Sequence, residues 1–169
     1  MRKAEALQAR REGERSVLLE QYKALIGDVG NIGVRYATAN GFYVSVITAL
    51  TGVLAYAGTQ GPLRMKALVV VILVCYVASV VCRIWRTTLR FYGALFGGKF
   101  AVLKEMEARL AFPVYAREYD EVYKKRAAPF LTDHEQLVPG ALHCFFSALA
   151  LVALFYLVFQ FARHMAWIH

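Results

Sequence analysis

The sequence predicts an all-α integral membrane protein with three transmembrane helices. The prediction follows from three long apolar runs, at residues 41–57, 65–82 and 141–161. The first and third runs contain no Asp, Glu, Lys or Arg, and the second contains only Lys66. Because a helix needs about 20 predominantly apolar residues to cross a bilayer core, each run can form a span, the first at the short end of the range. The content of 59% hydrophobic residues exceeds the roughly half that is typical of soluble domains.

Basic residues outside the spans predict how the chain is oriented. Lys and Arg number seven in residues 1–40, ten in 83–138, two in 58–66 and one after residue 161. Because cytoplasmic segments carry the excess of Lys and Arg, we expect a cytoplasmic N-terminus and an external, periplasmic C-terminus. The net charge of +8 comes with no nucleic-acid-binding motif. It therefore predicts anionic lipid headgroups as partners, and no nucleic acid.

The domain organisation follows from these segments. The first forty residues are charged throughout, which argues against a cleaved signal peptide. The good helix formers before residue 27 predict an N-terminal cytoplasmic helix. The predicted parts are a cytoplasmic helix (1–36), a transmembrane hairpin (37–82, with spans at about 41–57 and 65–82), a cytoplasmic helical segment (83–138), a third transmembrane helix (139–163) and an external tail (164–169).

Glycines and prolines predict where the helices bend or end, including the long cytoplasmic helix into which the second span is expected to continue. The triplet Gly27, Gly30 and Gly33 indicates a hinge or a close helix crossing. The pair Gly97–Gly98 should interrupt or bend the long second helix, which should end near Pro113 because proline disfavours helical geometry in the residue before it. Pro139 fits the first turn of the third span.

Small residues recur every fourth position along the first span. They are Ala37, Gly41, Ser45 and Ala49. Such a face lets helix backbones approach closely in lipid, where apolar side chains gain little from meeting one another. It predicts helix packing, and two partners remain open: the second span of the same chain, or a neighbouring subunit.

Charged and interfacial residues near the membrane ends are the predicted contacts with headgroups or with other subunits. Arg83, Arg86 and Arg90 fall three or four residues apart, on one side of a helix. Arg35 and Asn40 would line an inner vestibule if the assembly has a pore. The full predicted set is Arg35, Asn40, Arg83, Trp85, Arg86, Arg90, Lys99, Glu105, Glu107 and the basic trio Lys124, Lys125 and Arg126.

The sequence contains no recognisable catalytic constellation, so we expect no enzyme and no catalytic residue, metal or cofactor. There is no Walker loop, HExxH, GxSxG or CxxC motif. Cys75, Cys82 and Cys144 are expected to be small buried hydrophobes. His143 and Cys144 begin the third span, and no acidic residue lies within any span. The last point argues against a transporter driven through a central carboxylate.

Residues 35–113 resemble the RipA family of octameric bacterial membrane proteins. The resemblance lies at the entrance to the first span, at the exit from the second and in the helix that follows, at Arg35, Asn40, Phe42, Trp85, Arg86, Arg90, Lys99, Phe100, Glu105, Leu110 and Pro113. The two-span hairpin with a charged helix is also similar to the SLATT family, predicted membrane effectors of bacterial conflict systems. The chain departs from that family in its third span and in lacking a nucleotide-sensor partner domain.

What the first resemblance implies is a homo-oligomer, an octamer, in a bacterial inner membrane. The leading functional prediction is a non-enzymatic small membrane protein that assembles into a homo-oligomeric ring, with a channel or conduit as one role. The alternatives are a pore-forming membrane effector of a bacterial defence system, and a membrane scaffold for a soluble partner. Residues 1–33 and 114–138 would recruit that partner.

Overall fold

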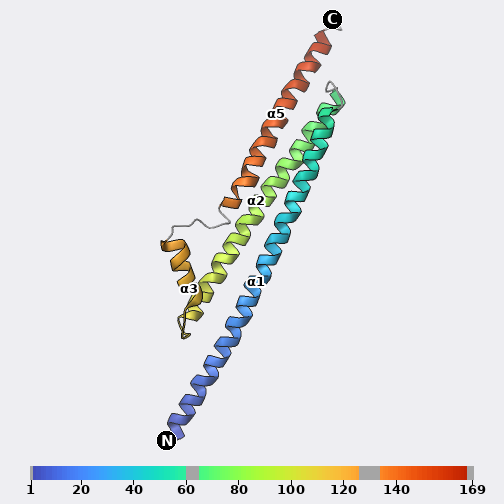
Figure 1. Cartoon of the computed structure of the whole chain (residues 1–169). Helices are drawn as coiled ribbons and strands as arrows, with labels where there is room; N and C mark the ends of the chain where they lie inside the picture. Colours follow the sequence, from blue (N-terminus) through green and yellow to red (C-terminus); the bar gives the residue numbers. More distant parts are fainter. Residues whose placement is uncertain (1, 60–64, 126–133, 167–169) are drawn as a thin grey trace. The chain divides into compact units, whose positions relative to one another are not determined.

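The structure is a computed structural model that describes residues 2–59, 65–125 and 134–166. Its elements are the α-helices α1 (Arg2–Thr59), α2 (Met65–Glu107), α3 (Val114–Tyr119) and α5 (Leu137–Ala166), and the π-helix η1 (Asp120–Lys125) (Figure 1). No strand occurs within the described ranges. The all-α prediction is confirmed.

Three of these helices are long and apolar enough to cross a membrane. They are α1, α2 and residues Leu137–Met165 of α5. Each contains one of the apolar runs, and the described part of the chain places no acidic residue inside those runs. The prediction of three helices able to span a membrane is confirmed, and α2 continues as one helix from the second apolar run to Glu107.

Two glycine clusters lie inside continuous helices. The predicted interruption at Gly97–Gly98 is wrong, whereas a bend there and a hinge at the first cluster stay predictions. Gly27, Gly30 and Gly33 lie within α1, and a Cβ atom added to any of them would meet nothing within 4 Å, so the described chain shows neither a break nor a close crossing there. The pair Gly97–Gly98 likewise lies within α2. A helical glycine costs only about 1 kcal/mol relative to alanine, which the hydrogen bonds and packing of the flanking turns can offset.

Helix α2 ends at Glu107, earlier than the predicted end near Pro113. Backbone bonds from Arg109 to Met106 (3.0 Å) and from Leu110 to Glu107 (2.9 Å) tighten the chain into a turn immediately after it. The helix therefore ends on a carboxylate. Pro139 falls within the first turn of α5, as predicted.

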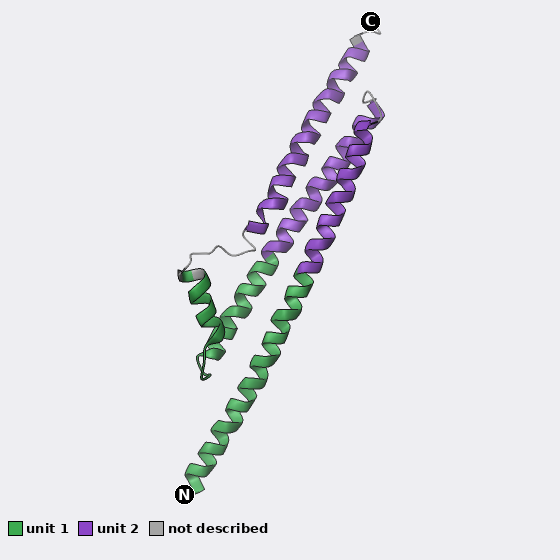
Figure 2. Cartoon of the chain, viewed as in Figure 1, with its two compact units in different colours: residues 1–36, 91–130 green, residues 37–90, 131–169 purple. Residues whose placement is uncertain are grey.

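The chain divides into two compact units (Figure 2). Unit 1 comprises Met1–Tyr36 and Phe91–Phe130, and unit 2 comprises Ala37–Arg90 and Leu131–His169. Unit 2 contains all three apolar runs.

Unit 2 has a core to which all three spans contribute. Its buried members are Ile47 from α1, Cys75, Ala78 and Cys82 from α2, and Phe146 from α5. The residues from α2 are small, which lets the neighbouring helices approach closely. Cys75 and Cys82 are buried as predicted, whereas Cys144 is exposed, so the expectation for the third cysteine was wrong.

Unit 1 is held by aromatic and polar contacts between the first part of α1 and the last part of α2. The Tyr36 ring meets those of Tyr92 and Phe96 edge-on, with centroids 5.5 and 6.1 Å apart. The Lys99 ammonium forms an ion pair with the Asp28 carboxylate. Leu103 is fully buried.

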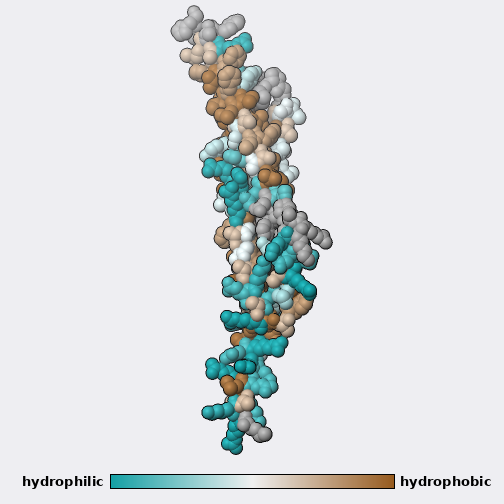
Figure 3. Space-filling model, turned by 90° about the vertical axis from the view of Figure 1, so that its left-hand side faces the viewer, coloured by the Kyte–Doolittle hydropathy of each residue, from teal (hydrophilic) through white to brown (hydrophobic). Residues whose placement is uncertain are grey.

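Large apolar side chains cover the outside of unit 2. Phe155 is 77% exposed and Leu151 is 67% exposed. On the face drawn in Figure 3, hydrophobic residues predominate towards the end of α5 and hydrophilic residues towards the start of α1. Exposed apolar surface on this scale is expected of helices surrounded by lipid or by other membrane helices.

Candidate subunit interface and intramembrane polar cluster

The small-residue face of α1 is exposed along its whole length. Ala37, Gly41, Ser45 and Ala49 are all exposed, and a Cβ on Gly41 would meet nothing within 4 Å. The opposite side of the same helix packs on the core of unit 2, through Ile47, Leu50 and Leu54. Of the two partners left open by the sequence, the second span of the same chain is therefore not the one that contacts this face.

The hydroxyl groups on this part of α1 are already satisfied. Ser45 donates to the Gly41 carbonyl oxygen and Thr48 to that of Val44, each at 2.8 Å. Because neither hydroxyl needs water or an outside acceptor, the face can meet another apolar surface without leaving a polar group unpaired.

Asn40 and Trp85, both predicted as outward contacts, instead meet each other within unit 2. Trp85 is only 5% exposed, and its Nε1–H donates to Asn40 Oδ1 at 2.8 Å. The Tyr43 ring stacks on the indole with centroids 6.0 Å apart, and the Tyr43 hydroxyl lies 3.1 Å from that of Thr88. A buried indole N–H requires an acceptor, and the Asn40 amide supplies it.

Glu107, also predicted as an outward contact, is 1% exposed and has every partner within unit 1. Its Oε1 accepts from the Tyr22 hydroxyl at 2.7 Å and from the Tyr115 amide at 2.8 Å, and its Oε2 accepts from the Ala116 amide at 2.9 Å. The carboxylate thereby satisfies free amides at the start of α3.

These contacts set the charge states of the pair. Burial alone would raise the pKa of Glu107, but the hydrogen bonds from Tyr115, Ala116, Tyr22 and Val114 lower it below its ordinary value. Burial, together with the hydrogen bond to Glu107 and its charge, raises the pKa of Tyr22 far above its ordinary value. At neutral pH the pair is therefore a carboxylate accepting from a neutral phenol.

The other predicted charged contacts differ in exposure and in their ion pairs. Arg35, Arg83, Arg86, Arg90 and Glu105 are exposed. Lys99 pairs with Asp28, and Lys124 lies 4.0 Å from Asp120, one helical turn away. The side chain of Lys125, and Arg126, lie outside the described residues.

A polar cluster that the sequence did not reveal lies between α2 and α5 in unit 2. Ser79 Oγ lies 2.7 Å from His143 Nδ1 and 2.8 Å from Ser147 Oγ, and His143 Nδ1 lies 3.2 Å from the Ser79 carbonyl oxygen. His143 was noted as an opening residue of the third span, but its serine partners were not. The available signal was the pair His143 and Ser147, one helical turn apart in an otherwise apolar run. No group of three or more metal-binding side chains occurs among the described residues.

The fold defines a three-span helical membrane protein, and its α1 carries an exposed face of small residues. The family model of the octameric membrane protein family (8xMP) matches residues 19–156, and the chain belongs to that family. Membership implies self-association, and it confirms the expected kinship with octameric membrane proteins. The narrower likenesses to the RipA and SLATT families stay predictions. Neither the curated proteins nor the solved structures contain a match to this chain.

Proposed function

We propose that this chain is the subunit of a non-enzymatic homo-octameric ring in a bacterial inner membrane, with its N-terminus in the cytoplasm. The observation that supports the proposal is the exposed face of Ala37, Gly41, Ser45 and Ala49 on the side of α1 away from α2. In a chain of an octameric family, that face is the natural site for a neighbouring subunit.

The argument rests on what drives helices together in lipid. Lipid tails are as apolar as leucine, so contacts depend on how closely two backbones can approach, and small residues permit the closest approach. Gly52 is also exposed, with nothing within 4 Å of an added Cβ, and it extends the small-residue face by another helical turn. A cyclic ring requires this face to pack on a different surface of the next copy, because its interface is heterologous.

Adding bulk to this face is expected to break the ring. In the variants Gly41→Leu and Ala49→Leu, a branched side chain holds the neighbouring backbone away from α1. We expect the octamer to give way to smaller species, with the three helices of each subunit still folded. Native mass spectrometry of the protein released from nanodiscs measures the subunit number directly.

The matched control is Ala148→Leu, the same enlargement at an exposed position of α5. It should leave the octamer intact. An octamer that survives both α1 substitutions would contradict the proposed interface, and a wild-type protein that weighs one subunit would contradict the ring itself.

A conduit along the ring axis stays a prediction, and it is tested separately by dye or ion flux into vesicles that contain the octamer. Flux that depends on Arg35, the exposed basic residue predicted at the inner mouth, would support it. Vesicles that contain the octamer and remain impermeable would contradict a conducting role for the ring. The hypotheses of a pore-forming defence effector and of a scaffold for a soluble partner also stay predictions.

A further inference from the structure

The residues at which α2 and α5 meet in unit 2 change from basic and polar at one end to apolar at the other. At one end Arg90 Nε donates to Gln136 Oε1 at 3.2 Å, and the Arg86 guanidinium lies 3.9 Å from where a Cβ on Gly140 would stand. Next comes the cluster of Ser79, His143 and Ser147. Beyond it lies an apolar groove.

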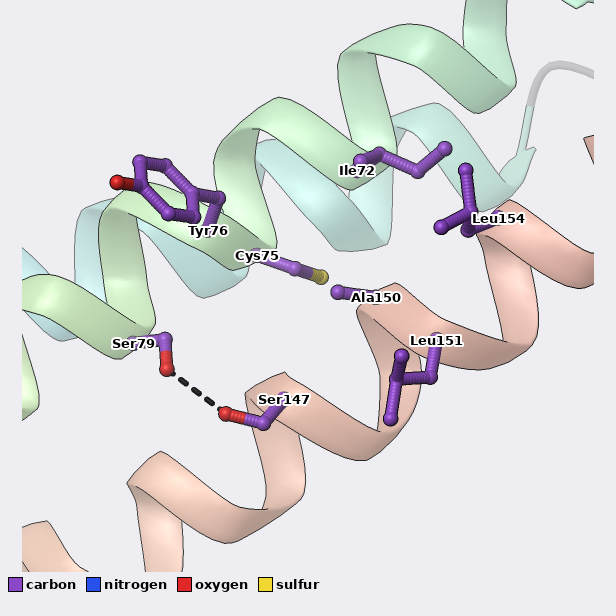
Figure 4. Close-up of a pocket in the computed structure, with 8 residues that line it drawn as sticks. All are labelled: Ile72, Cys75, Tyr76, Ser79, Ser147, Ala150, Leu151 and Leu154. Carbon is purple, nitrogen blue, oxygen red and sulfur yellow. Dashed lines mark hydrogen bonds between the residues drawn. The ribbon is translucent and has the colours of Figure 1, made fainter.

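The groove has a volume of about 300 Å³, at the lower end of the range for small-molecule pockets. Its walls include Cys75, Ala150, Leu151 and Leu154, with Ser79 and Ser147 at one end. Figure 4 shows the two serine hydroxyls facing each other at that end, and Leu154 beside Ile72 at the other.

We propose that this α2–α5 groove and the arginines beside it bind one anionic phospholipid per subunit. The guanidinium groups of Arg86 and Arg90 hold the phosphate, the Ser79–His143–Ser147 cluster faces the ester carbonyls, and the groove takes an acyl chain. The proposal does not depend on the octamer, because the lipid is bound within one subunit.

The spacing of the three parts fits such a ligand. Ser79 and Arg86 are separated by about 10 Å along the helix axis, at a rise of about 1.5 Å per residue. One headgroup layer of a bilayer is roughly 5–8 Å thick. Side chains on a helix lean towards its N-terminus, so the long arginine side chains of α2 can reach back towards the bilayer. Arg86 therefore reaches phosphate depth when the serines lie at the edge of the hydrocarbon, and Arg90, about 16 Å from Ser79 along the axis, approaches the phosphate from beyond the headgroups.

The arginines need an anion that the described chain does not supply. Neither Arg86 nor Arg90 forms an ion pair with a described residue. A second copy offers few carboxylates near this depth, because no Asp or Glu occurs from residue 29 to residue 104 or after Glu135, and burial raises the pKa of Glu135 itself. A lipid phosphate at the membrane surface meets that charge, which favours a lipid over a second copy as the occupant.

The polar cluster also retains hydrogen-bonding capacity. When Ser79 donates to His143 Nδ1, the proton of the neutral imidazole is on Nε2, and no described group bonds to that nitrogen. An ester carbonyl is an acceptor of the required kind. Glu135, next to Gln136, has a buried Oε2 without a partner, and burial raises its pKa, which reduces its repulsion of a phosphate.

Lipid binding by the full-length protein is measured by native mass spectrometry after stripping endogenous lipid with detergent. The added probes are phosphatidylglycerol, phosphatidylcholine and inorganic phosphate. We expect one phosphatidylglycerol per subunit, bound at least tenfold more tightly than phosphatidylcholine, and no competition from inorganic phosphate. Arg86→Gln should weaken phosphatidylglycerol about fivefold, whereas Lys66→Gln, a charge loss at the other end of the same span, should not.

Filling the groove tests the acyl-chain part. Ala150→Leu should lower retention of phosphatidylglycerol by tenfold or more, and the matched control Ala148→Leu, exposed on the same helix, should not. If Arg86→Gln does not fold, Arg90→Gln replaces it.

Three outcomes would overturn the proposal. Equal binding of the two lipids would mean that the bound lipid is non-specific lipid from the surrounding bilayer. Competition by inorganic phosphate would mean that the site binds an anion without an acyl chain. A change of subunit number in Ala150→Leu, with lipid retention unaltered, would assign the groove to a second copy.

Discussion

Replacing Glu107 with glutamine is expected to loosen α3 and to speed amide hydrogen exchange there about 100-fold. The substituted side chain would keep one acceptor oxygen but turn an NH2 group towards an amide N–H that Glu107 now accepts from, at Tyr115 or Ala116. Losing charge-assisted hydrogen bonds at a buried site costs about 3 kcal/mol, and tenfold in exchange corresponds to about 1.4 kcal/mol. Exchange measured by mass spectrometry on peptides covering residues 108–125 tests this directly.

The control for that experiment is Glu105→Gln, the same chemical change at an exposed carboxylate two residues earlier. It should leave the exchange of α3 unchanged. Lowering the pH should also reduce the protection of α3 against amide exchange, as Glu107→Gln does. Because the folded state lowers the pKa of Glu107, its contribution to stability is complete above the ordinary value of 4.5 and is lost as the pH falls through the lowered value. Equal exchange in wild type and Glu107→Gln at pH 7 would show that the carboxylate does not hold α3.

Trp85→Ala is expected to cost about 3–5 kcal/mol, the largest loss of stability of any single substitution considered for unit 2. It removes a side chain that is 5% exposed, the stacking with Tyr43 and the donor that satisfies Asn40. The melting temperature of the detergent-solubilised protein should fall by roughly 10 °C. The matched control, Ile84→Ala, trims a neighbouring side chain that is 51% exposed and should change it little.

A double-mutant cycle separates the hydrogen bond from the packing. Trp85→Phe keeps an aromatic ring but leaves Asn40 Oδ1 without its donor, for a cost of about 1–3 kcal/mol. Combined with Asn40→Leu, it should cost less than the two single changes together. Strict additivity would show that the two side chains do not act as a pair.

The sequence predicted the spans well because their signal is local. An uninterrupted apolar run of about 20 residues has few alternatives in a protein, and the runs in α1, α2 and α5 needed no knowledge of their neighbours. The helix boundaries were harder. The pair Gly97–Gly98 predicted an interruption on propensity alone, but the cost of a helical glycine is small enough for the flanking turns to offset it.

The candidate site was harder still to predict, because its contacts join residues far apart in sequence. Trp85 fits the general rule for interfacial tryptophans, and nothing local indicates that Asn40, 45 positions earlier, accepts its N–H. Glu107 sits among charged neighbours in a pattern typical of a solvated helix face, yet it is buried against Tyr22 and α3. The spacing of Ala37, Gly41, Ser45 and Ala49 predicts a packing face. The structure shows that this face is exposed and lies away from the core of unit 2, and its contact with a neighbouring subunit stays a prediction.

The unequal exposure of the three cysteines allows distances between subunits to be measured by spectroscopy at a single natural position. Cys75 and Cys82 are buried, whereas Cys144 is exposed on α5, so a membrane-permeant thiol label should modify one position without mutagenesis. In a symmetric ring, spin labels at that position repeat around a circle, and the ratio of second-neighbour to first-neighbour spacing depends only on the number of subunits. Distances between labels at this natural cysteine would therefore give the number of subunits in a native membrane.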